Sequence, residues 1–162
     1  MSDPFPGPTN GNGGPAEGMR VQILGQYVKD LSFENPAAPQ NLSVRPQIEL
    51  GFDLQAKRLS TDQFEVEMKV RVNAKAEDKT VFLLELLYGG MFLIQGAPDE
   101  ILQPFLLIEA PHLLFPFVRR VVADVIRDGG MPPLMIEPID FAELYRQNQA
   151  NAAQQQQQSA IV

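Results

Sequence analysis

Strict alternation of apolar and polar residues predicts two strands in the first half of the chain. Residues 64–74 carry apolar side chains at every even position and polar ones at every odd position, the pattern of a strand with one buried face. Residues 47–54 alternate in the same way. Four apolar residues share one face of that second strand: Ile48, Leu50, Phe52 and Leu54.

Residues 80–88 form a third predicted strand. A short charged turn separates it from residues 64–74, so the two are expected to pair as an antiparallel hairpin. One face carries core residues, Phe82, Leu84, Leu86 and Tyr88, and the other carries Val81, Leu83, Glu85 and Leu87. Either this second face is an interaction surface, or a helix or loop covers it. Gly89 and Gly90 are expected to end the strand with a bend.

A further strand is predicted near the start of the folded region. Val21, Ile23 and Tyr27 alternate with Gln22, Leu24 and Gln26. We expect this strand at the edge of the sheet, where it pairs with the sheet or with another copy of itself.

The second half has helical periodicity. Asp99 and Glu100 begin an apolar stretch that extends to Ile108, with the acids at the positive end of the helix dipole. Pro111 is expected to interrupt it. The helix resumes over residues 113–126, where Pro116 is tolerable only near the first turn. Because residues 113–126 are apolar around more than one face, this helix is either central to the fold or in contact with another subunit.

Strands followed by helices indicate an α+β fold. Asp140 and Glu143 form a capping-box-like start for a last helix. Residues 1–18 are half proline and glycine and are expected to form a disordered leader. The folded domain then spans residues 19–147, and residues 148–162 form a Gln-rich flexible tail.

Composition excludes several classes of protein. The chain has 162 residues, a net charge of −7, no cysteine and one histidine, which leaves no disulfides, thiolate zinc site or multi-histidine metal centre. The acidic balance argues against nucleic acid and favours a basic partner. Without a basic region before an apolar stretch at the N-terminus, no secretory signal is predicted and a cytoplasmic location is expected. The uncharged and largely apolar run of residues 86–98 is too short and too interrupted to insert into a membrane.

Catalytic motifs are missing from the sequence. There is no nucleophile elbow, P-loop or dinucleotide fingerprint, and His112 has no evident nucleophile or acid partner. We therefore predict no enzyme and no cofactor, and a structural or surface role for His112. The rival hypothesis is an enzyme or small-ligand domain that uses His112.

Several separated segments resemble one family. Residues 19–147 are similar to SecB, the bacterial protein-export chaperone, and the segments that carry the likeness are residues 27–36, 85–92, 113–119 and 133–141. The resemblance implies a four-stranded antiparallel sheet with a long kinked helix and a C-terminal helix on one face, assembled as a homotetramer that is a dimer of dimers. It also implies an ATP-independent holdase that keeps precursor proteins unfolded in the cytoplasm and delivers them to the motor SecA, whose zinc-bearing tail is basic.

The resemblance also assigns two sets of residues. The SecA-binding residues correspond to Asp30, Glu34, Leu83 and Glu85. The client-binding groove corresponds to Val44, Ile48, Leu50, Phe52, Leu144 and Tyr145, each of which is alternatively an ordinary core residue. The last helix becomes polar after Tyr145 and the tail has no acids, which leaves a second SecA contact through the tail open. The alternative function is a SecB-like chaperone for non-export clients such as a toxin–antitoxin pair.

Overall fold

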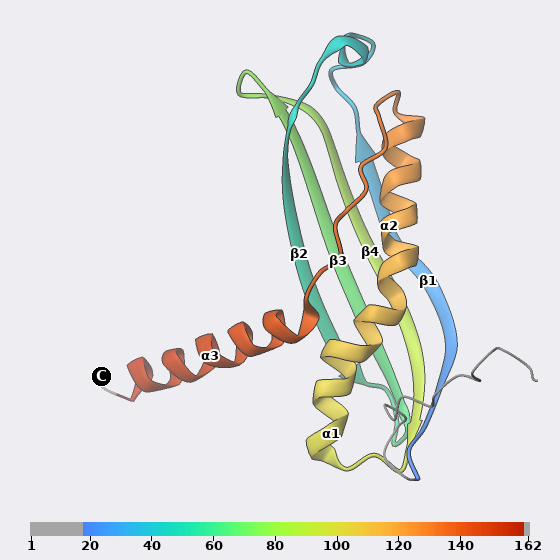
Figure 1. Ribbon diagram of the computed structural model, residues 1–162, viewed down its shortest axis with the longest axis vertical. Helices are drawn as coiled ribbons and strands as arrows, with labels where there is room; N and C mark the ends of the chain where they lie inside the picture. The colour runs from blue at the N-terminus through green and yellow to red at the C-terminus, as the bar shows by residue number, and fades with distance from the viewer. Residues whose placement is uncertain (1–17, 161–162) are drawn as a thin grey trace, which may run out of the picture.

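The fold is built on a four-stranded antiparallel sheet (Figure 1). The computed structural model describes residues 18–160, so the predicted leader lies outside the described residues apart from Gly18. The strands are β1 (Arg20–Glu34), β2 (Gln47–Arg58), β3 (Gln63–Ala76) and β4 (Lys79–Gln95). They lie in the order β1-β4-β3-β2, which confirms the hairpin of β3 with β4 and places β1 at an edge.

One face of the sheet forms the core. Even-numbered side chains of β3 and β4 are almost completely buried there: Phe64, Val66, Met68, Val70, Val72, Phe82, Leu84, Leu86 and Phe92. Each such side chain stabilises the fold by roughly 1.5–3 kcal/mol relative to an exposed position. The long helix packs on this face, which we call the helix-bearing face, and its Leu114, Val118 and Val122 are fully buried there. We call the opposite face of the sheet the helix-free face.

Two glycines lie inside β4 and do not end it. Gly89 pairs with Tyr27 and Gly90 with Gln26, so the predicted bend is wrong. On the helix-bearing face, a Cβ at Gly90 would lie 2.6 Å from Cδ2 of Leu114. On the opposite face, a Cβ at Gly89 would clash with the ring of Tyr27. The two glycines are required because other groups approach the strand closely from both sides.

The long helix runs without a break from Asp99 to Asp128. It consists of α1 (Asp99–Pro104), a π-helical turn (Phe105–Glu109) and α2 (Ala110–Asp128), and it changes direction between α1 and α2 (Figure 1). The predicted interruption at Pro111 is therefore wrong.

A π-helical turn explains how the helix continues. The amide of Ala110 bonds the carbonyl of Phe105, five residues back, and this wider turn makes room immediately before the ring of Pro111. Pro116 lies in the interior of α2, contrary to the prediction that it belongs near a first turn. Pro116 and His112 are both exposed, so the carbonyl of His112 that Pro116 cannot pair lies on the solvent side.

An 18-residue stretch within the Asp99–Asp128 helix has a mean hydropathy of 1.5, so by length and composition this helix would also suffice to cross a membrane. A core helix of a soluble protein meets the same criterion, and here the apolar face of α2 packs on the sheet. The expectation that the chain does not insert into a membrane stays a prediction.

Two connections complete the helix-bearing face. The crossover between β1 and β2 contains a short 3₁₀ helix, η1 (Gln40–Ser43). There the amides of Asn35 and Asn41 both donate to the carbonyl of Gly129 at the end of α2, at 2.9 and 3.0 Å. Residues 131–140 run back along the sheet in extended form (Figure 1).

The last helix, α3 (Phe141–Ser159), begins where predicted. The carboxylate of Asp140 accepts a hydrogen bond from the amide of Glu143 at 3.0 Å, and Phe141 is fully buried. From Arg146 onward every described side chain is exposed, and the helix projects away from the sheet (Figure 1). The helix continues to Ser159, through the segment expected to be a flexible tail, and the fraying of that segment stays a prediction.

Candidate functional site

The predicted SecA-binding residues meet on the face of the sheet opposite α2. Antiparallel pairing of β1 with β4 places Glu34 beside Leu83, Ser32 beside Glu85 and Asp30 beside Leu87. No helix of residues 18–160 covers this helix-free face, and Leu83, Glu85 and Leu87 are half-buried there. The sequence left two alternatives for this second face of β4: an interaction surface, or a face covered by a helix or loop. The described residues favour the first, an uncovered surface. We call Asp30, Glu34, Leu83 and Glu85 the acidic patch.

Arg71 was not identified from the sequence, yet it holds one member of the patch. Its Nε donates to Oε1 of Glu85 at 2.7 Å, across the β3–β4 ladder in which the two residues are directly paired. The sequence predicted the hairpin but not its register, and an irregularity between Ala74 and Lys75 shifts the pairing beyond the turn, so the sequence pattern did not identify this pair. Among the described residues no ion pair involves Asp30 or Glu34, and both are exposed. These two carboxylates therefore carry the uncompensated charge of the patch.

A polar network lies next to the patch on the same face. Its centre is the buried carboxylate of Glu65, which accepts a hydrogen bond from the hydroxyl of Tyr27. Lys29 Nζ lies 3.1 Å from Glu65 Oε1 and 2.7 Å from Glu67 Oε1, and Lys57 Nζ lies 3.2 Å from Glu65 Oε1. We call these five residues the Glu65 network; it connects β1, β3 and β2.

The charges of the Glu65 network stabilise one another. Burial by itself raises the pKa of the Glu65 carboxyl, but hydrogen bonds from Tyr27 and Lys29 favour the charged form and bring its pKa down to about 2. Burial and the bond to Glu65 raise the pKa of the Tyr27 hydroxyl to about 12. Hydrogen bonds to Glu67 and Glu65 raise the pKa of the Lys29 ammonium to about 12. At neutral pH the network is a fixed set of paired charges.

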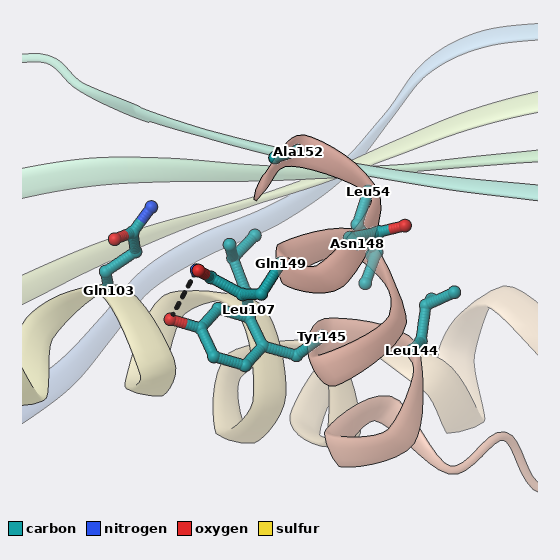
Figure 2. Close-up of a pocket in the computed structure, with 8 residues that line it drawn as sticks. All are labelled: Leu54, Gln103, Leu107, Leu144, Tyr145, Asn148, Gln149 and Ala152. Atoms are coloured by element: carbon teal, nitrogen blue, oxygen red, sulfur yellow. Dashed lines mark hydrogen bonds between the residues drawn. The ribbon is translucent and has the colours of Figure 1, made fainter. Parts of the chain in front are cut away.

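An apolar groove follows β2 on the helix-bearing face. Leu144 and Tyr145 line a cavity of about 220 Å³ together with Leu54 and Leu107, and the hydroxyl of Tyr145 accepts a hydrogen bond from Gln149 at 3.0 Å (Figure 2). A second cavity of about 320 Å³ shares Leu54 and Leu107 and continues along α1. The two cavities form one groove between the β2 edge and the start of the long helix.

The predicted groove residues do not all meet at one cavity. Ile48 and Leu50 are 40% and 45% exposed along β2, and the ring of Phe52 packs against Phe141 at 5.9 Å between centroids. Val44 lines a different hollow, about 870 Å³ in volume, between the crossover and the β3–β4 turn. The residues therefore form an apolar strip along β2 with a cavity near each end.

Four of the leucines that line the groove were not assigned to it from the sequence: Leu54, Leu102, Leu106 and Leu107. Only Leu54 had a local signal, because it continues the alternation of β2.

The structure gives His112 a packing role. Its ring meets the ring of Phe141 edge-on, with centroids 4.8 Å apart. In residues 18–160 no group of three or more His, Asp or Glu side chains has an arrangement that would hold a metal ion.

Comparison with known proteins identifies the family. The family model described as preprotein translocase subunit SecB matches residues 15–152. Protein-export protein SecB of Zymomonas mobilis is 54% identical over 130 residues, 79% of each chain. The protein of the same name from Afipia carboxidovorans is 52% identical over 143 residues, 86% of this chain and 89% of the relative.

A solved structure shares the fold. A SecB-like chaperone of Mycobacterium tuberculosis, determined with a ChAD peptide from an antitoxin, superposes with a TM-score of 0.63 at 16% identity, covering 74% of this chain and 91% of that one. At this identity the likeness concerns the fold, and it agrees with the expected sheet and helices. The chain belongs to the SecB family and is a chaperone for protein export.

Proposed function

We propose that the protein is an ATP-independent holdase that keeps precursor proteins unfolded and export-competent in the cytoplasm and delivers them to SecA. The observation that supports the proposal is that one sheet carries two separate surfaces on its opposite faces. The acidic patch lies on the helix-free face at the β1–β4 ladder, and the apolar groove follows β2 on the helix-bearing face. A client and the motor can therefore bind at the same time.

The groove suits unfolded chains. Its apolar lining includes Leu54, Leu102, Leu106, Leu107 and Leu144, and the exposed Ile48 and Leu50 extend it along β2. Apolar contact requires little sequence preference, and many weak contacts add up when several sites engage one long client. A chaperone of this kind needs several copies of the groove, which an oligomer supplies.

A homotetramer built as a dimer of dimers fits the unpartnered surfaces of the chain. β1 is an edge strand of 15 residues with exposed Leu24, Val28 and Leu31, a template for pairing with a second copy. On the long helix, Leu113 and Phe117 are 45% and 41% exposed on the side away from the sheet. The strand and the helix provide two separate apolar contacts, as two kinds of interface require.

The acidic patch suits a basic partner. Asp30 and Glu34 carry charge that no described ion pair compensates, and Leu83 adds an apolar contact in the same patch. Opposite charges across an interface steer encounter and fix the register of docking. The basic zinc-bearing tail of SecA matches this surface. The α3 helix has no charged side chain after Arg146, so we assign no second SecA contact to it.

The alternative of a chaperone for a toxin–antitoxin pair is not favoured, because the relatives that are 44–54% identical are named protein-export proteins.

Two measurements test the proposal. Purified protein should slow the folding and aggregation of an export precursor without ATP, and it should bind SecA in titration calorimetry. Asp30→Lys and Glu85→Lys should leave the tetramer intact in light scattering and weaken SecA binding by ~1–3 kcal/mol. Absence of both activities would overturn the holdase, and unchanged SecA affinity in both variants would overturn the docking surface.

A further inference from the structure

A β-bulge in β1 determines which way the acidic patch faces. Val28 pairs with Tyr88 and Asp30 pairs with Leu87, so Lys29 is an extra residue opposite a continuous partner strand. Tyr27, beside Gly89, lies on the helix-free face. Uninterrupted alternation from Tyr27 would turn Asp30 to the helix-bearing face, because one step along a strand exchanges the faces. The bulge keeps Asp30, and Glu34 after it, on the helix-free face.

The extra residue is anchored by its side chain. Lys29 Nζ lies 2.7 Å from Glu67 Oε1 and 3.1 Å from Glu65 Oε1, although both acids are on β3 and β4 lies between. The missing side chain at Gly89 leaves the space across β4 open, and the ring of Tyr27 fills part of it. Glu65 is buried, so the anchor rests on a fixed partner.

We propose that Lys29 is a positioning residue for SecA docking: its ion pairs with Glu65 and Glu67 hold the β-bulge that presents Asp30 and Glu34 on the helix-free face. This inference rests on the proposed docking of SecA at the acidic patch. It adds a residue that the patch itself does not contain and whose charge has the opposite sign.

The positive charge of Lys29 makes it possible to distinguish a positioning role from a direct electrostatic effect on SecA binding. A lysine beside an acidic patch repels a basic partner, so on charge alone its removal should strengthen docking. If Lys29 positions the patch, its removal should weaken docking in spite of the more favourable charge. The two explanations predict opposite changes in one measured affinity.

The test compares three variants of the full-length chain for binding to SecA by titration calorimetry. Lys29→Met keeps the stem and removes the anchor, and should weaken binding about tenfold. Lys29→Arg keeps the ion pairs and should bind like the wild type. Deletion of Lys29 joins Val28 to Asp30 in regular pairing with the same faces, so it needs no anchor and should bind within about threefold of the wild type.

Controls distinguish the possible failures. Lys75→Met removes another lysine that pairs across strands, 3.4 Å from Glu49, and should leave the affinity unchanged. Equal or tighter binding by Lys29→Met, or loss of binding on deletion of Lys29, would overturn the positioning role. If the Lys29→Met variant does not assemble, the variant with Lys29 deleted decides the question, because the positioning role requires that this deletion variant bind SecA. Unchanged binding by Asp30→Asn would instead refute the docking surface on which the inference rests.

Discussion

The ionised form of Glu65 is expected to make the protein's stability depend on pH in the acidic range. Glu65→Gln retains the size of the side chain and an acceptor for the Tyr27 hydroxyl, but removes the charge that Lys29 and Lys57 neutralise. In the variant, two lysines lose a buried partner. We therefore expect a lower free energy of unfolding at neutral pH and a smaller loss in acid.

The pKa values set the magnitude and the sign. The pKa of Glu65 is 4.5 ordinarily and about 2 in the folded protein. Each unit of difference between these pKa values corresponds to about 1.4 kcal/mol. The charged form therefore contributes at most about 3 kcal/mol to stability. Above pH 4.5 this contribution is complete. As the pH falls, the unfolded chain takes up the proton first, so about 2 kcal/mol is lost by pH 3 and the rest as the pH approaches 2.

Urea unfolding at pH 7, 5, 4 and 3 measures this difference at one fixed protein concentration. The wild type should exceed Glu65→Gln by about 2 kcal/mol at pH 7, because glutamine keeps part of the hydrogen bonding, and the gap should mostly close by pH 3. Glu49→Gln is the matched control, since Glu49 also pairs with a lysine, at 3.4 Å, but is exposed and should change stability by less than about 1 kcal/mol. A gap that stays constant from pH 7 to pH 3 would refute the reasoning.

Three further predictions concern the core, the crossover and the groove. Gly90→Val should lower the free energy of unfolding by roughly 1–3 kcal/mol in thermal scans, since its side chain would collide with Leu114; Gly25→Val, which meets open space, is the control, and equal stability of the two variants would contradict the packing. Asn41→Ala removes two hydrogen bonds of a buried amide and should cost about 1–2 kcal/mol in urea unfolding; an unchanged midpoint would contradict this anchoring role. Leu50→Gln should change stability by less than about 0.5 kcal/mol but speed the release of an unfolded precursor in stopped-flow fluorescence, and an unchanged release rate would remove Leu50 from the groove.

Where one face of a strand is buried and the other is solvated, the sequence predicted the structure well. Residues 64–74 were predicted as a strand, and β3 spans Gln63–Ala76. In β1 the same rule failed. Val21, Ile23 and Tyr27 were placed on one face, but the bulge at Leu24 moves Tyr27 to the opposite face. A second bulge, at Lys29, exchanges the faces again for the rest of the strand. The ring of Tyr27 lies over Gly89 and its hydroxyl reaches Glu65, and these partners are too distant in the chain for local pattern to identify.

Proline rules failed in the long helix for a related reason. Pro111 and Pro116 each remove a helical hydrogen bond, and this local cost predicted an interruption at Pro111 and a position near a first turn for Pro116. Burial of Leu114, Val118 and Val122 against the sheet offsets that cost, and the π-helical turn relieves the crowding before Pro111. Tertiary packing of this kind cannot be predicted from a short stretch of sequence around each proline.

The acidic patch was predicted through the family resemblance and through the apolar side chains beside Glu85, but the role of β3 in it was not. Even-numbered residues of β3 fill the core. Odd-numbered residues such as Glu65, Glu67 and Arg71 hold Lys29 and Glu85 in place from the helix-free face. Because alternation separates these two sets, neutral substitutions at odd positions of β3 should impair SecA docking and leave client holding intact. Substitutions at even positions disturb the core beneath both surfaces, so they should impair both activities together.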